Sequence, residues 1–153
     1  MVDIEQVMDI KLFKDFSVTE IERILGIAKL QSFKVGETII RENVVGKELY
    51  IIVEGEVRIS KLVSTGESVN FAILRRGNFF GELSLLTQKA HSATAEAVEN
   101  TQVMSINKTD FDKFVETDPQ AGFKMLKSII CEISELLKQM NDKFIDMMGY
   151  MWR

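Results

Sequence analysis

Residues 79–97 read FFGELSLLTQKAHSATAEA and combine an apolar run with a tail of small residues. The run carries one acid, Glu82, and the chain's only histidine, His91, lies between the run and the tail. Three interpretations are open for this stretch: a loop that binds an anion, a metal or catalytic site, or a plain turn in a β-fold. The sequence around it separates them.

The composition indicates a single soluble domain. The chain has 153 residues, of which 46% are hydrophobic and 27% charged, which is enough for one domain with a core. A net charge of −4 argues against free-standing nucleic-acid binding, so we predict no direct DNA binding. The one cysteine excludes an intrachain disulfide, and neither a signal peptide nor a membrane-length apolar run is present. We therefore expect a cytoplasmic protein without a membrane span.

Glycines recur in the middle of the chain at intervals of about ten residues, which is typical of an all-β sandwich or barrel. Turns are predicted at Val35–Gly36, at Glu54–Gly55 and near Glu99–Asn100. We divide the chain into an N-terminal helical segment at 1–30, a β-roll at 31–107 and C-terminal helices at 108–153. These make one mainly β domain, 1–153, with flanking helices and no output domain.

Capping signals mark three helices outside the β-zone. Ser17 and Glu20 form a capping box before an apolar run at helical spacing. Thr109 is the predicted cap of a short helix. Asp118-Pro119 begins a long helix that continues to about Met148, because proline suits a first helical turn. Thirty residues of helix span about 45 Å.

The long helix carries a seam of apolar residues spaced alternately by four and three, as in a coiled coil. The seam consists of Leu126, Ile130, Ile133, Leu137, Met140, Phe144, Met147 and Met151. The alternative is a helix lying on its own β-domain. Because a helix of this length outreaches a small barrel, we predict a homodimer that forms through Leu126, Ile130, Ile133, Leu137, Met140 and Phe144.

A metal or catalytic site is poorly supported. A metal site in a β-barrel usually gathers several His or carboxylate ligands, and this chain has one histidine. Ser84 and Ser92 are candidate nucleophiles only by residue type, because no strained elbow motif surrounds them. We predict a non-enzyme with no catalytic residue, no metal and no cofactor. The rival interpretation of His91 is a partly exposed loop residue.

The anion interpretation has a physical basis. A helix that starts after Gly81 presents free N–H groups, against which a phosphate could bind at Leu83 and Ser84. The Ser92 hydroxyl can donate as well. Glu82 would repel a phosphate but suits a neighbouring sugar hydroxyl. This combination indicates the ribose phosphate of a nucleotide.

The sequence also resembles a known module. The matching segments are Gly36-Glu37, then Gly46 with Leu49–Val57, and then LRRGNFFGELSLL at 74–86. These resemble the cyclic nucleotide-binding domain of the catabolite activator protein, protein kinase A regulatory subunits and cyclic-nucleotide-gated channels. The resemblance runs from about Leu12 to Met148. It implies a β jelly-roll barrel in which the FGELSLL block is a phosphate-binding cassette.

The resemblance also implies roles for individual residues. Glu82 falls where the family glutamate binds the ribose 2′-hydroxyl, and the amides of Leu83 and Ser84 fall where the family binds the cyclic phosphate. The predicted ligand-binding residues are Phe80, Gly81, Glu82, Leu83, Ser84, His91 and Ser92, and the predicted ligand is cAMP or cGMP.

One departure from the family pattern falls inside the cassette. The family has a proline–arginine pair where this chain has Ala90-His91. Arginine gives phosphate a permanent bidentate cation, whereas a histidine of ordinary pKa is mostly neutral at pH 7. We therefore predict weak or pH-sensitive affinity. Lys89 would share a face with His91 if the segment were extended, and could then compensate.

The predicted function is a cyclic-nucleotide sensor that relays its signal through the long helix to a protein partner. Ser134, Lys138 and Asn141 are the helix residues considered for contact with the base. The alternative is a degenerate module that has lost the ligand and serves in dimerisation or protein interaction. A jelly-roll enzyme of the cupin type is disfavoured by the single histidine.

Overall fold

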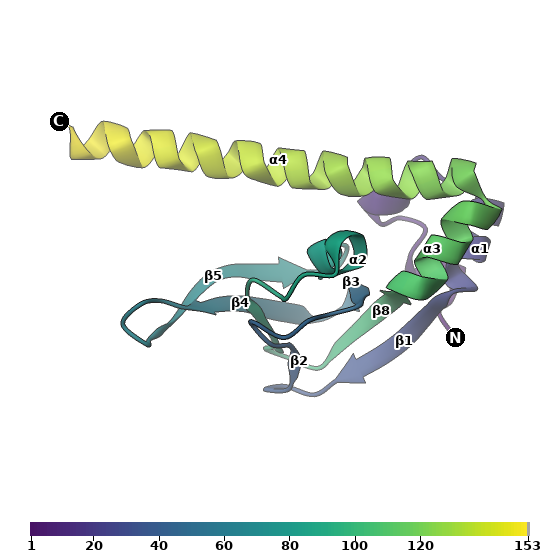
Figure 1. The fold of residues 1–153 in the computed structure, drawn as a ribbon, viewed down its shortest axis with the longest axis horizontal. Coiled ribbons are helices and arrows are strands. Elements are labelled where there is room, and N and C mark those ends of the chain that lie inside the picture. The colour runs from purple at the N-terminus through teal and green to yellow at the C-terminus, as the bar shows by residue number, and fades with distance from the viewer. Residues whose placement is uncertain (153) are drawn as a thin grey trace.

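Two antiparallel sheets of four strands each form a β-roll in a computed structural model that describes residues 1–152 (Figure 1). The first sheet has the order β1 (Ala28–Phe33), β8 (Thr101–Asn107), β3 (Glu48–Glu54) and β6 (Phe79–Phe80). The second has the order β2 (Thr38–Ile40), β7 (Thr94–Ala97), β4 (Glu56–Leu62) and β5 (Ser68–Arg75). The predicted jelly roll with flanking helices is confirmed.

The strands form because apolar residues alternate along them and the glycines allow sharp reversals between them. In β4, Val57 and Ile59 are buried while their neighbours are more exposed, so one face of the strand points inward. The predicted turn at Glu54–Gly55 joins β3 to β4, and Gly55 has a φ of 98° that favours glycine. β1 begins at Ala28, three residues before the predicted boundary of the roll, because it pairs with β8 from Ala28 onward.

Six helices flank the roll within the described residues. They are the 3-10 helices η1 (Ile4–Gln6) and η2 (Lys11–Phe13), and the α-helices α1 (Val18–Leu25), α2 (Glu82–Thr87), α3 (Lys108–Thr117) and α4 (Pro119–Met151). The Ser17–Glu20 capping box of α1 is confirmed. Asp118 caps α4 as expected, and its side chain accepts from the N–H of Ala121. The cap of α3 is Asn107 rather than Thr109, because the Asn107 side chain accepts from the N–H of Thr109 at 2.8 Å.

The first half of α4 packs on the domain, and the second half runs on above β4 and β5 without packing on the core, so that only its C-terminal end passes the β4–β5 turn (Figure 1). Met125 and Ile129 are fully buried in the cluster that also holds Leu12 and Phe13 of the N-terminal segment. Every residue from 134 to 152 is exposed. The helix therefore outreaches the β-roll, as its length predicted.

Candidate functional site

The turn into α2 depends on Gly81. This residue has a φ of 81°, and a Cβ at this position would lie 2.6 Å from the carbonyl O of Glu48. Only glycine fits both the backbone conformation and the close approach. On its N-terminal side, the Phe80 ring stacks on Tyr50 with centroids 5.2 Å apart, which holds the start of α2 against β3.

A cavity of about 200 Å³ lies between this turn and the second sheet. The structure brings all seven predicted ligand-binding residues together around it, although they come from two segments: the start of α2 with the two residues before it, and the stretch before β7. The lining comprises Phe80, Gly81, Glu82, Leu83, Ser84, His91 and Ser92, with Ile40, Ile59, Phe71, Ala72, Leu74, Phe79, Ala93 and Leu136. The lining is thus mainly apolar, with a few polar groups at one end, as small-molecule sites usually are.

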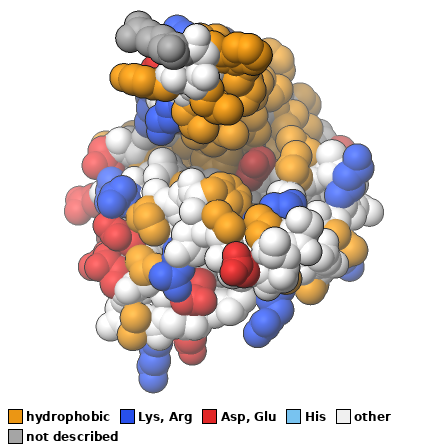
Figure 2. Space-filling view, turned by 90° about the vertical axis from the view of Figure 1, so that its left-hand side faces the viewer, with side chains coloured by type: hydrophobic (Ala, Val, Ile, Leu, Met, Phe, Trp, Pro, Cys, Tyr) orange, Lys and Arg blue, Asp and Glu red, His pale blue; other side chains and the backbone are white. Residues whose placement is uncertain are grey.

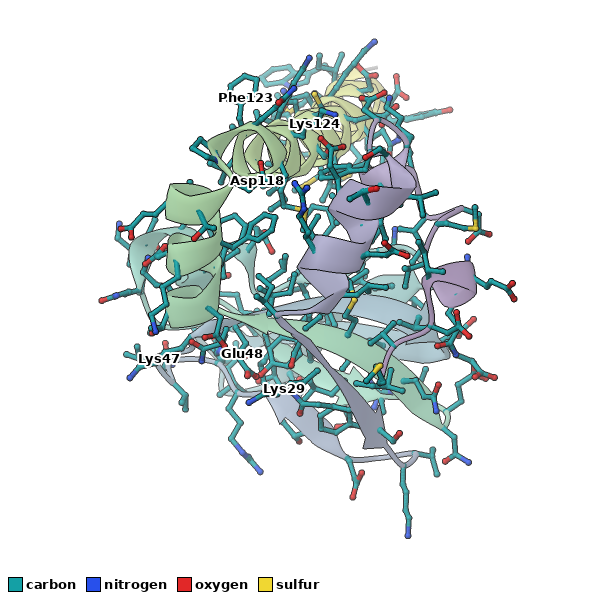
Figure 3. All side chains as sticks on the ribbon, turned by 90° about the vertical axis from the view of Figure 1, so that its right-hand side faces the viewer. Lys29, Lys47, Glu48, Asp118, Phe123 and Lys124 are labelled. Atoms are coloured by element: carbon teal, nitrogen blue, oxygen red, sulfur yellow. The ribbon has the colours of Figure 1, made fainter. Side chains whose placement is uncertain are left out.

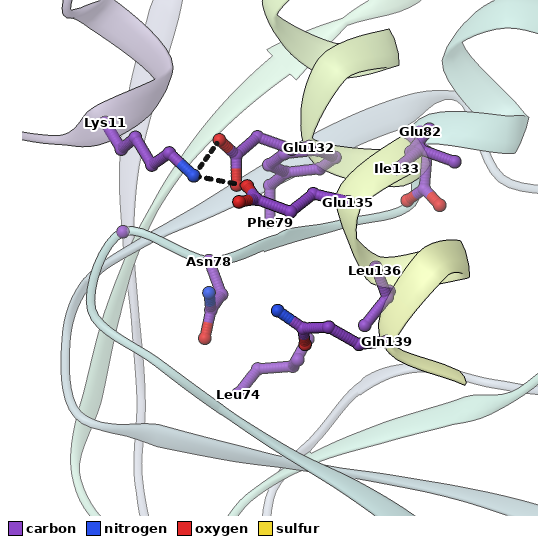
Figure 4. A pocket seen from close by; sticks show the side chains of 11 residues that line it. Lys11, Leu74, Asn78, Phe79, Glu82, Glu132, Ile133, Glu135, Leu136 and Gln139 are labelled. Atoms are coloured by element: carbon purple, nitrogen blue, oxygen red, sulfur yellow. Dashed lines mark hydrogen bonds and ion pairs between the residues drawn. The ribbon is translucent and has the colours of Figure 1, made fainter. Parts of the chain in front are cut away.

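A second cavity, of about 380 Å³, lies beneath α4 (Figure 4) and shares the lining residues Leu74, Phe79, Glu82 and Leu136 with the first. Glu82 lines both spaces, and burial raises the pKa of its carboxyl above the ordinary value. Asn78 and Gln139 face the second cavity from opposite sides, one from the roll and one from α4. The two cavities are therefore neighbouring compartments with an acid in the wall that they share.

His91 is buried, with 9% of its surface exposed, so the interpretation as a partly exposed loop residue is wrong. Its Nδ1 lies 3.1 Å from the Ser84 Oγ, and its ring packs on Gly46. Its backbone N–H donates to the carbonyl of Val44, which fixes the segment in place. Burial lowers the pKa of His91, so the ring is neutral at pH 7. The pH-sensitive affinity remains a prediction, now shifted toward more acidic pH.

Two other expectations for the cassette change in detail. The N–H of Ser84 already donates to the carbonyl of Gly81 at 3.1 Å, so a bound anion would have to share this donor. Lys89 is exposed and lines neither cavity, because Gln88, in a left-handed conformation with a φ of 54°, ends α2 and turns the chain. The condition for compensation by Lys89 is therefore not met, and Lys89 is an exposed loop charge.

The residues that α4 presents to the cavities are not those considered from the sequence. Ser134, Lys138 and Asn141 line neither cavity, whereas Leu136 and Gln139 do. Burial of Met125 and Ile129 sets the rotation of the helix and so decides which side chains face the roll. The sequence showed the apolar seam but not which stripe docks on the domain.

The seam itself divides into two parts. Leu126 and Ile133 are partly buried on the core, and Ile129, which lies next to the seam residue Ile130, is fully buried. The remaining members are 56–76% exposed: Ile130, Leu137, Met140, Phe144, Met147 and Met151. Sequence reasoning missed Phe123, which lies seven residues before Ile130, is 66% exposed and lies on the outer surface of α4 (Figure 3).

The exposed seam makes one side of α4 apolar along most of its length. Figure 2 looks onto the end where α4 projects and shows hydrophobic side chains covering much of the helix. Within residues 1–152, no helix is both long and apolar enough to cross a bilayer. The same described residues contain no cluster of three His, Cys, Asp or Glu side chains arranged as a metal site.

The sequence profile of the cyclic nucleotide-binding domain matches residues 30–118, which is more than half of the chain. The chain therefore belongs to the cyclic nucleotide-binding domain family. The matched segment contains the whole β-roll apart from the start of β1, together with α2 and all seven cavity residues predicted from the sequence.

Curated relatives include regulators of two kinds. The chain is 37% identical over 94 residues to a cAMP-dependent protein kinase regulatory subunit of Mycosarcoma maydis, a match covering 61% of this chain and 18% of the relative. It is 30% identical over 100 residues to the Cyclic AMP receptor protein of Thermus thermophilus, covering 65% of this chain and 46% of the relative. The chain thus spans less than half the length of these relatives.

Solved structures share the fold. A cyclic nucleotide-binding domain from Methylobacillus flagellatus superposes with a TM-score of 0.84 at 22% identity, covering 93% of this chain and 80% of that chain. The Catabolite Activator Protein of Thermus thermophilus gives a TM-score of 0.78 at 24% identity, covering 91% and 63%. These likenesses extend beyond the β-roll to the flanking helices.

Proposed function

We propose that this chain is a regulatory domain that binds a cyclic nucleotide, cAMP or cGMP, in the two cavities that share Glu82. The observation that carries the proposal is the convergence of the seven predicted residues on one cavity in a chain of this family. The domain acts as a cytoplasmic sensor rather than as an enzyme.

The smaller cavity accommodates the cyclic phosphate and the larger one the base. The phosphate binds against Leu83, Ser84 and Ser92, which line this cavity. Glu82 accepts a hydrogen bond from the ribose 2′-hydroxyl, since its carboxyl lines both cavities and the ribose lies between the phosphate and the base. A buried carboxyl needs such a partner, because burial without one is costly.

The base fits beneath α4. Phe79 and Leu136 supply apolar walls, and the carboxamides of Asn78 and Gln139 supply donors and acceptors for the base edge (Figure 4). An adenine presents a donor and an acceptor side by side, which one carboxamide can bind with two hydrogen bonds. This pairing does not distinguish cAMP from cGMP, because guanine also presents a donor and an acceptor side by side.

Ligand and helix position are linked because α4 forms part of the cavity wall. Lys11 forms ion pairs with Glu132 and Glu135 at the rim of the larger cavity, which tie α4 to the N-terminal segment. A ligand that contacts Gln139 binds better to one position of α4 than to others, and so shifts the balance between them. The second half of α4 then carries the change to a partner.

That partner includes a second copy of this chain. The exposed residues Phe123, Ile130, Leu137 and Phe144 recur every seven residues, which is the spacing that pairs two helices. An apolar stripe of this length is costly to leave in water. We therefore propose a homodimer through α4, with Leu126 and Ile133 at its inner edge.

Isothermal titration of the full chain with cAMP and with cGMP tests the function. Saturable heat is expected for at least one of the two nucleotides. The absence of heat for both nucleotides at millimolar concentration, in a protein that is folded by circular dichroism, would overturn the proposal. A dimer without ligand binding would instead indicate a module that serves only in association.

A further inference from the structure

The phosphate end of the smaller cavity has no cation in its wall. None of the described residues that line this cavity is a lysine or an arginine, and burial lowers the pKa of His91, which disfavours its charged form. A cyclic phosphate carries a permanent negative charge, and phosphate sites in proteins generally supply a positive partner. A charge just beyond the wall would complete the site.

Lys61 lies at that position. On β4, Val57 and Ile59 point into the roll, and Lys61 follows them on the same face of the strand, at its exposed end. Ile59 lines the cavity, and the Lys61 Nζ donates to the carbonyl O of Ser92 at 2.9 Å. The ammonium group is therefore held beside Ser92, at the phosphate end of the cavity.

The Lys61 ammonium is free to serve a ligand as well. It has three donors, and the bond to Ser92 uses one of them. Its other neighbour is the Glu42 carboxylate, at a loose 3.8 Å, and the side chain is 53% exposed. Glu42 also accepts from the N–H of Leu62 at 3.0 Å, so it keeps a partner if Lys61 turns toward the cavity.

Neighbouring cations are less suited to this role. Arg58 lies on the opposite face of β4, where it forms a 2.6 Å ion pair with Glu96. Lys89 is exposed and lines neither cavity. Lys11 borders the larger cavity and is paired with two glutamates of α4.

We propose that Lys61 supplies the positive charge that binds the cyclic phosphate, in the place of the arginine that the cassette lacks. The inference rests on the proposed function, because it assigns the phosphate of the cyclic nucleotide to the Ser92 end of the cavity. It makes β4, rather than the cassette, the source of the charge.

The test is a titration of the full chain with cAMP at several salt concentrations, using wild type, Lys61→Met, Lys61→Arg and Lys89→Met. Loss of a charged hydrogen-bond partner should weaken binding about tenfold or more in Lys61→Met. The same variant should show a shallower dependence of affinity on salt, since one charge is removed from the site. Lys61→Arg should retain most of the affinity, and Lys89→Met should bind within about twofold of wild type.

The outcomes separate this inference from the proposed function. If wild type binds cAMP and Lys61→Met binds equally well with an unchanged salt dependence, the Lys61 assignment is overturned and the sensor function stands. If Lys89→Met is the weakened variant, the charge comes from the cassette and the assignment is also overturned. If wild type binds neither nucleotide, both proposals fail together. Thermal unfolding of each variant shows that a loss of binding is not a loss of folding.

Discussion

The imidazole of His91 packs so closely on Gly46 that a Cβ at position 46 would overlap the ring atoms Cε1 and Nε2. The ring Nδ1 also lies 3.1 Å from the Ser84 Oγ, which the same Cβ would approach to 2.9 Å. The histidine that replaces the expected arginine is therefore a packed part of the wall, held between the loop before β3 and helix α2. It cannot reach further into the cavity without leaving both neighbours.

The first prediction concerns this packing. Gly46→Ala should lower the free energy of unfolding by about 1–3 kcal/mol, because the added methyl group forces the buried ring to move. His91→Ala should remove much of that penalty in the double variant, since the overlapping atoms are then absent. Urea denaturation of the four proteins measures the coupling. If the losses of unfolding free energy in the two single variants simply add in the double variant, the packing is contradicted. Gly149→Ala is the control, because a Cβ at that position meets open space.

The second prediction concerns the dependence of stability on pH. His91 has a lower pKa in the folded protein than in the unfolded chain, so the unfolded chain takes up its proton first as the pH falls below about 6.5. The contribution of His91 to stability is therefore complete above that pH and is lost toward more acidic pH. Wild type should lose more stability than His91→Gln between pH 7 and 5.5 in urea titrations. Equal losses in the two proteins would show that the ring is not held neutral.

The third prediction is that a change at Glu82 has opposite effects on ligand binding and on stability. Burial raises the pKa of this carboxyl, so its contribution to stability falls as the pH rises above about 4.5. Glu82→Gln should therefore melt at a higher temperature than wild type at pH 7 without ligand. The same variant should bind cAMP about tenfold or more weakly, because the ribose hydroxyl loses a charged acceptor. Glu67→Gln, an exposed change between β4 and β5, should alter neither property. A Glu82→Gln variant that binds like wild type would remove Glu82 from the site.

The fourth prediction concerns association through α4. Phe144→Glu places a charge in the exposed seam and should convert the dimer to a monomer in analytical ultracentrifugation. Lys138→Glu introduces the same side chain outside the seam and should leave the dimer intact. Both residues lie in the part of α4 that makes no contact with the domain core, so neither change should unfold the monomer. Wild type that sediments as a monomer at high micromolar concentration would exclude this interface.

Local interactions in the sequence determined where most elements begin and end. The Ser17–Glu20 box and the Asp118-Pro119 pair act within one helical turn, so they are readable without tertiary structure. Gly55 and Gly81 mark reversals because their positive φ values suit glycine alone. The cassette that these signals frame was likewise readable, because its members lie close together in the chain.

Only the tertiary structure decided which side chains from distant parts of the chain contact one another and which face of α4 is buried. The burial of His91 against Gly46 joins residues 45 positions apart, and the contact of Lys61 with Ser92 crosses from β4 to the segment before β7. The apolar pattern of α4 predicted a helix with an apolar seam, and only the packing of Met125 and Ile129 on the core showed which side of the helix docks. That choice placed Gln139 over the cavity and left Phe123 and Phe144 in solvent. Periodicity reports which residues share a face of a helix, and only the complementary surface of the rest of the chain selects the face that is buried.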